Sequence, residues 1–137
     1  MDPKRILVVE DDRDLALGLR VWLKARGYDG AVSTSGAEAI DQMTRWQPDL
    51  VLLDLGLPDE DGLQVLGRMR ANPLLAGIPV VILTAGEAAL KKVQAFSSGA
   101  EAFLCKPVDR LDLQRTIEHV LQAQERTPLR VEATQAP

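Results

Sequence analysis

The stretch DLVLLDLGLPDEDG, residues 49–62, indicates how the chain folds. Residues 50–53 form an unbroken apolar run, which is typical of a strand buried on both faces of a parallel sheet. Asp54 follows this run directly, and Gly56 and Pro58 then favour a turn. A carboxylate at the end of a buried strand costs free energy unless it has a partner, and ligands bind at this edge of open α/β sheets. Asp54 is therefore either an ordinary turn residue or part of a functional site.

Four other short apolar runs predict strands of the same sheet. They occupy residues 6–9, 28–33, 80–83 and 102–105. Segments with apolar residues at helical spacing follow each strand, and the fourth of these segments carries Ala89, Val93 and Phe96. The alternation predicts an α/β fold, a (βα)5 doubly wound five-stranded parallel sheet with helices on both faces. Gly30 weakens the run at 28–33, which favours an edge position for that strand.

Composition and length set the broad class of protein. A chain of 137 residues is one domain by size, and its periodicity is lost after about Gln124. We therefore expect a domain over residues 1–124 and a disordered tail or linker stump over residues 125–137. The net charge of −4, from 20 acidic and 16 basic residues, argues against a nucleic-acid surface. A single cysteine, no membrane-length apolar run and no signal-peptide pattern predict a cytoplasmic protein.

Polar residues end four of the five predicted strands: Glu10 and Asp11, Asp54, Thr84, and Lys106. In a parallel sheet these ends lie on one edge. Each residue alone has a simpler explanation, since acidic residues favour a helix N-terminus, aspartate is common in turns, and a lone threonine or lysine is usually structural or solvated. The combination on one edge instead predicts a functional site.

These groups suit phosphoryl chemistry assisted by a divalent cation. Clustered carboxylates raise one another's pKa unless a cation joins them, and Mg²⁺ typically binds one or two carboxylates together with water and phosphate. A carboxylate can also attack phosphorus to form an aspartyl phosphate. The ammonium of Lys106 and the hydroxyl of Thr84 can stabilise the phosphoryl oxygens.

Four sequence pieces together resemble the receiver domain of two-component response regulators: ILVVEDD (6–12), DLVLLDLGLPDEDG (49–62), VVILTA (80–85) and FLCKP (103–107). The resemblance covers residues 4–122 and implies a flavodoxin-like fold with strand order 2-1-3-4-5. It also implies a response regulator receiver, a phosphoprotein that accepts a phosphoryl group from a partner phosphohistidine in a Mg²⁺-dependent reaction. Such a protein switches its surface in phosphorelay signal transduction. It is not an enzyme in the usual sense, because it catalyses only its own phosphorylation and dephosphorylation.

The resemblance assigns a role to each strand-end residue. Asp54 is the expected phospho-acceptor and contributes to the metal site. Asp11 is expected to bind Mg²⁺ directly, Glu10 through water or a hydrogen bond, and Gly56 through its backbone carbonyl. Asp12 has no family role and is expected to be only an N-cap.

The remaining family positions concern the phosphoryl group and the switch. Thr84 and Lys106 are expected to hold the phosphoryl group, and Thr84 and Phe103 to form the switch. Phe103 lacks the hydroxyl of the tyrosine often found there, so its switching would depend on packing alone. Lys106-Pro107 is expected to be a cis peptide bond.

The family also implies partners. The expected phosphodonor is a sensor histidine kinase or a histidine phosphotransfer protein. Lys91 and Lys92 lie on the predicted fourth helix, which usually means a solvated face, although in this family that face meets partners. The sequence does not name the downstream effector. We expect no direct nucleic-acid or membrane contact by this domain. A monomer or weak dimer is expected, because Ala102 stands where dimerising members carry an aspartate.

Two other functions are compatible with the same residues. The chain could be an aspartyl-phosphate phosphohydrolase, although Gly56 stands where common aspartate phosphatases have a second aspartate. It could also be a degenerate receiver that acts only as a binding scaffold, although the set of site residues is intact. Away from the site, we expect Cys105 to be a core residue and His119 to lie at the surface or its boundary.

Overall fold

The computed structural model describes residues 2–85 and 99–135, with side chains in the last helix described up to Glu125. The fourth predicted helix, with Ala89, Val93 and Phe96, lies outside the described residues. So do Gly86 and the pair Lys91-Lys92.

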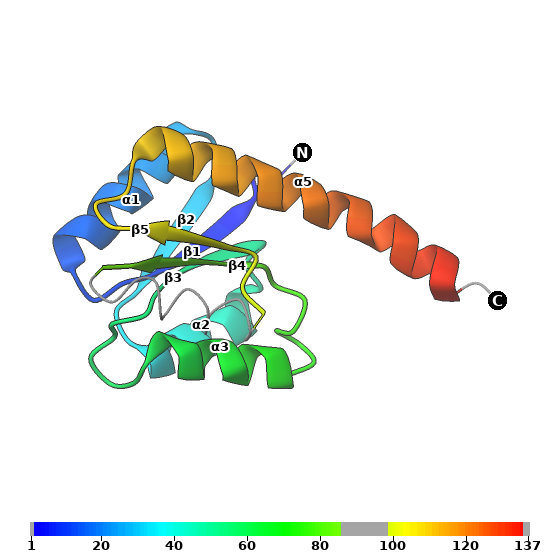
Figure 1. The fold of residues 1–137 in the computed structure, drawn as a ribbon, viewed down its shortest axis with the longest axis horizontal. Coiled ribbons are helices and arrows are strands. Elements are labelled where there is room, and N and C mark those ends of the chain that lie inside the picture. Colours follow the sequence, from blue (N-terminus) through cyan, green and yellow to red (C-terminus); the bar gives the residue numbers. More distant parts are fainter. Residues whose placement is uncertain (1, 86–98, 136–137) are drawn as a thin grey trace.

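A five-stranded parallel sheet forms the centre of the protein (Figure 1). Its strand order is β2-β1-β3-β4-β5, which confirms the predicted α/β fold class and the edge position of β2. The strands are β1 (Arg5–Val9), β2 (Asp29–Ser33), β3 (Leu50–Asp54), β4 (Val80–Thr84) and β5 (Ala102–Cys105). Every residue of β3 and β4 is buried, as the unbroken apolar runs predicted.

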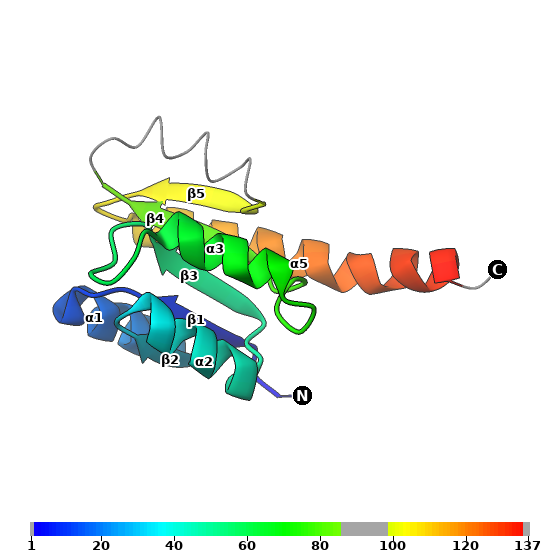
Figure 2. The same ribbon diagram turned by 90° about the horizontal axis from the view of Figure 1, so that it is seen from below.

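Helices cover both faces of the sheet. The described helices are α1 (Arg13–Ala25), α2 (Gly36–Trp46), α3 (Gly62–Ala71) and α5 (Arg110–Gln135). Figures 1 and 2 show α1 and α5 on one face and α2 and α3 on the other. Asp12 caps α1 by accepting hydrogen bonds from the backbone N–H groups of Asp14 and Leu15 at 3.1 and 3.2 Å, which confirms its predicted capping role.

The core consists of two apolar layers, one on each face of the sheet. Alternate residues of a strand enter different layers, because successive side chains of a strand point to opposite faces. Ile6 and Leu52 pack with residues of α1 and α5. Leu7 and Leu53 pack with residues of α2 and α3. The strands are therefore held firmly from both sides, and their carboxyl ends provide a rigid edge for a site.

Three features at the C-terminal side differ from or add to the sequence predictions. The backbone of α5 stays helical to Gln135 and extends beyond the rest of the fold (Figure 2). Periodicity did not indicate this extension, and the domain boundary at residue 124 stays a prediction. Cys105 is exposed, so its assignment to the core was wrong: it ends β5, an edge strand of the sheet. His119 is exposed, as expected.

No described helix combines the length and apolarity needed to cross a membrane.

Candidate functional site

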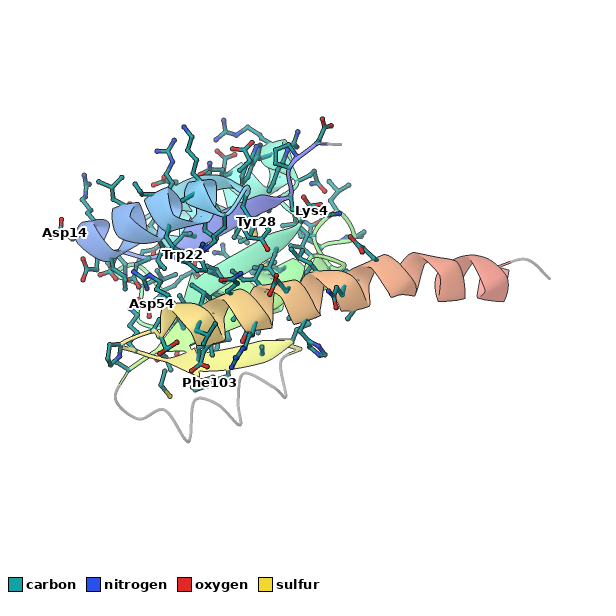
Figure 3. All side chains as sticks on the ribbon, turned by 90° about the horizontal axis from the view of Figure 1, so that it is seen from above. Lys4, Asp14, Trp22, Tyr28, Asp54 and Phe103 are labelled. Carbon is teal, nitrogen blue, oxygen red and sulfur yellow. The ribbon has the colours of Figure 1, made fainter. Side chains whose placement is uncertain are left out.

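The carboxyl ends of the strands bring the predicted residues to one edge of the sheet. Asp54 and Thr84 are the last residues of β3 and β4, Glu10 directly follows β1, and Lys106 directly follows β5. In Figure 3, Asp54 lies at the end of the molecule where α1 begins, marked by Asp14. The convergence predicted from the strand ends is therefore present.

Three carboxylates form a compact acidic cluster at this edge, which we call the carboxylate cluster. Glu10, Asp11 and Asp54 each place an oxygen within 4.8 Å of the others. Glu10 is only 1% exposed and Asp54 6%, whereas Asp11 is exposed. Two of the three carboxylates, those of Glu10 and Asp54, are therefore buried, and that of Asp11 is open to solvent.

Lys106 places its cation against the buried carboxylates. Its Nζ lies 2.5 Å from Glu10 Oε1 and 3.4 Å from Asp54 Oδ1. The Lys106 side chain is 21% exposed, so these ion pairs are only partly screened by solvent. The cis geometry of Lys106-Pro107 agrees with the sequence prediction.

The pKa values of two groups reflect this crowding. Burial raises the pKa of Glu10 to about 7, with a further upward contribution from the Asp54 charge, against the lowering effects of Lys106 and the Asp12 N–H. Burial lowers the pKa of Lys106, but its bonds to Glu10 and Asp54 outweigh this and leave the pKa above 10.5. One ammonium therefore stabilises the buried carboxylates only in part, and the cluster attracts further positive charge.

Thr84 and Phe103 lie on neighbouring strands. Thr84 is 5% exposed, and its hydroxyl donates to the Ala85 carbonyl at 3.3 Å. Phe103 lies on β5 (Figure 3) and is half-buried. It aligns with Ile82 of β4 and packs against the layer of α2 and α3. The Thr84 hydroxyl thus lies at the site edge with a hydrogen bond to Ala85, and the aromatic ring lies on the adjoining strand.

The loop after Asp54 closes tightly on itself. The Gly56 N–H donates to Asp54 Oδ1 at 3.2 Å, and the Gly62 N–H donates to the Leu55 carbonyl at 2.9 Å. Gly56 and Asp61 also form an antiparallel bridge. These bonds hold the nucleophile candidate and Gly56 in one compact turn.

The residues present fit a small divalent cation. Three carboxylates with oxygens within 4.8 Å of one another provide the hard oxygen donors that Mg²⁺ prefers. Apart from the Lys106 ion pair, no described residue supplies a hydrogen bond to Glu10 Oε1, although this atom is buried. A cation bound at the cluster would supply further positive charge to the buried Glu10 carboxylate.

Sequence reasoning missed two residues that support the site. The Ser33 carbonyl, at the end of β2, accepts the Glu10 N–H at 3.0 Å. Asp59, in the loop after Asp54, accepts two hydrogen bonds from the start of α2. Neither contact leaves a signal in sequence spacing, because each joins segments that are distant in sequence and that only the folded sheet brings together.

The fold and the site define the class of this protein. The family model of the response regulator receiver domain matches residues 6–118, so the chain belongs to this family of two-component signalling proteins.

Known relatives and solved structures agree with this class. The chain is 36% identical over 124 residues to the DNA-binding dual master transcriptional regulator RpaA of Synechocystis sp., covering 90% of this chain and 52% of that protein. It is 37% identical over 125 residues to the DNA-binding response regulator MtrA of Mycobacterium tuberculosis H37Rv, covering 91% and 54%. The chain thus spans about half the length of these relatives.

Two solved structures show the same fold over most of their length. A CheY-like response regulator receiver domain protein from Methanospirillum hungatei superposes with a TM-score of 0.86 at 28% identity, covering 91% of this chain and 98% of that chain. The signal receiver domain of a putative Luxo repressor protein from Vibrio parahaemolyticus has a TM-score of 0.86 at 32% identity, with 93% and 96% covered.

Proposed function

We propose that this receiver domain accepts a phosphoryl group on Asp54 from a phosphohistidine of a partner protein, in a Mg²⁺-dependent reaction. The observation that carries the proposal is the position of Asp54. Its carboxylate is buried at the end of β3 and lies close to Glu10 and Asp11 in the carboxylate cluster. Lys106 Nζ lies 3.4 Å from its Oδ1.

The chemistry follows from these positions. An Asp54 carboxylate oxygen attacks phosphorus, the phosphorus–nitrogen bond of the phosphohistidine breaks, and the imidazole leaves with the electron pair and takes up a proton. Lys106 offers an ammonium to the phosphoryl oxygens, and Thr84 offers a hydroxyl. Dephosphorylation would be the attack of water on the same phosphorus.

The metal would be held by Asp11, Asp54 and the Gly56 carbonyl, with Glu10 acting through water or a hydrogen bond. When bound, Mg²⁺ supplies positive charge to the phosphoryl oxygens and to the clustered carboxylates. The chain's own contribution is to bury Asp54 and to aim its Oδ1 by the Gly56 N–H bond.

The switch would use Thr84 and Phe103. After phosphorylation, the Thr84 hydroxyl would leave the Ala85 carbonyl for the phosphoryl group, and Phe103 would turn into the space left behind. This is a population shift between two packings, biased by the phosphoryl group. Because Phe103 has no hydroxyl, the inward state would be stabilised by packing of the ring alone.

The phosphodonor would be a sensor histidine kinase or a histidine phosphotransfer protein. The names of RpaA and MtrA attribute DNA binding to those proteins. For the residues described here we propose no nucleic-acid contact, because the chain carries a net charge of −4. A monomer or weak dimer and a cytoplasmic location stay predictions.

The test is phosphorylation with acetyl phosphate, followed by intact mass spectrometry. We expect the wild type to gain one phosphoryl group with Mg²⁺ and none with a chelator. Asp54→Asn should gain none under either condition, and Asp41→Asn, which changes an exposed aspartate on α2, should behave as the wild type.

Beryllofluoride provides a second readout without turnover. With Mg²⁺ it should shift the amide resonances of Thr84 and Phe103 in the wild type and leave Asp54→Asn unchanged. The proposal fails if the wild type shows neither labelling nor shifts, as a degenerate scaffold would. Sustained release of phosphate from small phosphomonoesters would instead indicate a phosphohydrolase.

A further inference from the structure

Asp59 joins two loops of the site by hydrogen bonds between a side chain and a helix start. Its Oδ1 accepts the Gly36 N–H at 2.9 Å, and its Oδ2 accepts the Ala37 N–H at 3.1 Å. Asp59 lies in the loop after Asp54, whereas Gly36 and Ala37 are the first residues of α2. We call this pair of bonds the Asp59 clip.

The start of α2 is shaped to receive the clip. The first backbone N–H groups of a helix lack partners within the helix. Ser35 Oγ accepts the Glu38 N–H at 3.2 Å. Asp59 accepts the N–H groups of Gly36 and Ala37, to which Ser35 makes no bond. A Cβ at Gly36 would come within 2.8 Å of both Glu60 Cγ in the loop and Val65 Cγ2 in α3, so the loop and α3 pack directly on this residue. Hydrogen bonds from Gly36 and Ala37 lower the pKa of Asp59 below 3.8, which keeps the carboxylate ionised at neutral pH.

The clip links two segments that are hydrogen-bonded to different members of the carboxylate cluster. On one side, Ser33 precedes α2 by a short connection, and its carbonyl accepts the Glu10 N–H at 3.0 Å. On the other side, Asp59 belongs to the loop in which the Gly56 N–H donates to Asp54 Oδ1. A continuous chain of bonded segments therefore leads from Glu10 through the start of α2 to the Asp54 loop.

The Asp54 loop is anchored at its base and at its tip. At the base, the Gly62 N–H bonds the Leu55 carbonyl, and Gly56 bridges to Asp61. At the tip, Asp59 bonds α2, and Glu60 pairs with Arg68 of α3. The Glu60 pair ties the loop to the helix that follows it, whereas the Asp59 clip ties the loop to the start of α2, which comes earlier in the chain.

We propose that Asp59 is a positioning residue that holds the Gly56 turn, and with it the Asp54 carboxylate oxygens, beside Glu10 and thereby sets Mg²⁺ affinity and the rate of Asp54 phosphorylation. This inference rests on the proposed function. Loss of the clip would free the loop tip, and the Gly56 turn that aims Asp54 would move relative to Glu10. Groups that orient metal ligands without touching the metal typically change affinity or activity by about 10–100-fold when removed.

The experiment compares Asp59→Ala with Ser35→Ala. Both substitutions remove hydrogen bonds from the first turn of α2, but Ser35 bonds only within the helix. Mg²⁺ alone is titrated into each protein and followed by the amide resonances of Asp54 and Gly56, and the acetyl phosphate rate is then measured at saturating Mg²⁺. We expect Asp59→Ala to raise the Mg²⁺ dissociation constant and lower the rate, each by about 10-fold. Ser35→Ala should leave both within about 2-fold of the wild type, because the hydrogen bond that it removes stays within α2 and does not reach the Asp54 loop.

The conservative variant and an activity-independent readout complete the test. Asp59→Asn keeps one side-chain oxygen acceptor and should recover part of the Mg²⁺ affinity. Hydrogen exchange at residues 55–61 should accelerate in Asp59→Ala and not in Ser35→Ala, whether or not the protein is phosphorylated. Equal losses in Asp59→Ala and Ser35→Ala, or unchanged Mg²⁺ binding in Asp59→Ala, would overturn the positioning role. A wild type that neither binds Mg²⁺ nor becomes labelled would overturn the proposed function instead, and the exchange data would still report on the clip.

Discussion

Gly62→Ala is expected to damage both the stability and the site, although alanine normally favours a helix over glycine. Gly62 is the first residue of α3 and lies directly on the backbone of the phospho-acceptor candidate. A Cβ at this position would come within 2.5 Å of the Asp54 carbonyl oxygen and within 2.7 Å of Leu55 Cα. Ordinary van der Waals contact begins at 3.4 Å, and both atoms belong to the backbone, so no side-chain rotation relieves the overlap.

Gly67 of the same helix provides the matched control. No heavy atom lies within 4 Å of a Cβ built there, and the residue is exposed. Gly67→Ala should therefore raise the free energy of unfolding by about 0.5–1 kcal/mol, the usual helical advantage of alanine. Gly62→Ala should lower it by about 1–3 kcal/mol, the typical cost of forcing extra atoms into a packed site.

Urea unfolding followed by circular dichroism measures the two stabilities, and acetyl phosphate labelling measures the site. The labelling rate is taken well below both unfolding midpoints, so that both variants are folded. Gly62→Ala should label more slowly than Gly67→Ala, because relief of the overlap displaces the Asp54 backbone. If Gly62→Ala were as stabilising as Gly67→Ala, the close packing of α3 on Asp54 would be refuted.

Three further predictions concern the charges and the exposed surface. Lys106→Met should lower the acetyl phosphate rate by roughly 10²–10³-fold, the usual effect of losing one group that stabilises transition-state charge; a rate within a few-fold of wild type would exclude that role. Burial raises the pKa of Glu101 above 4.5, so the folded state binds more protons than the unfolded state above that pH, and stability falls as pH rises. Glu101→Gln should remove this component, and parallel pH–stability profiles of the two proteins would contradict it. Leu17 and Val21 lie four residues apart on one face of α1 and are 57% and 62% exposed. If this apolar face docks the phosphodonor, Leu17→Asp should slow transfer from a phosphohistidine protein and spare acetyl phosphate labelling; equal slowing with both donors would argue against a docking role.

Much of the fold was predictable because its main signals are local. An unbroken apolar run such as residues 50–53 needs burial on both faces, and alternation with helices then requires parallel strands. The residues that follow the strands must lie on one edge in such a sheet. The approach of Lys106 to Glu10 and Asp54 is a consequence of this geometry and needed no information on loops.

The contacts that refine the site were not predictable, because they join loops that are distant in sequence. Asp59 looks like any turn aspartate until the start of α2 is placed beside it. Lys106 was expected to serve the phosphoryl group on Asp54, yet its Nζ lies nearer to Glu10, at 2.5 Å against 3.4 Å. Cys105 was assigned to the core because its strand is apolar in sequence, but an edge strand exposes its last residue.

Strand register explains why the edge of the sheet and its loops contribute differently to the site. Val9 aligns with Leu53, so Glu10 and Asp54 follow in the same row. Asp54 aligns with Leu83, and Thr84 aligns with Cys105, which places Thr84 one residue and Lys106 two residues beyond the row of Asp54. A slip of one residue would send each side chain to the opposite face, so the buried layers fix this arrangement firmly.

Register, however, fixes positions only along the strands. The turn that aims the Asp54 oxygens lies beyond the last pair of β3, and its placement depends on Gly62 at the base and Asp59 at the tip. Substitutions at these two positions should therefore change phosphorylation while the sheet itself stays intact.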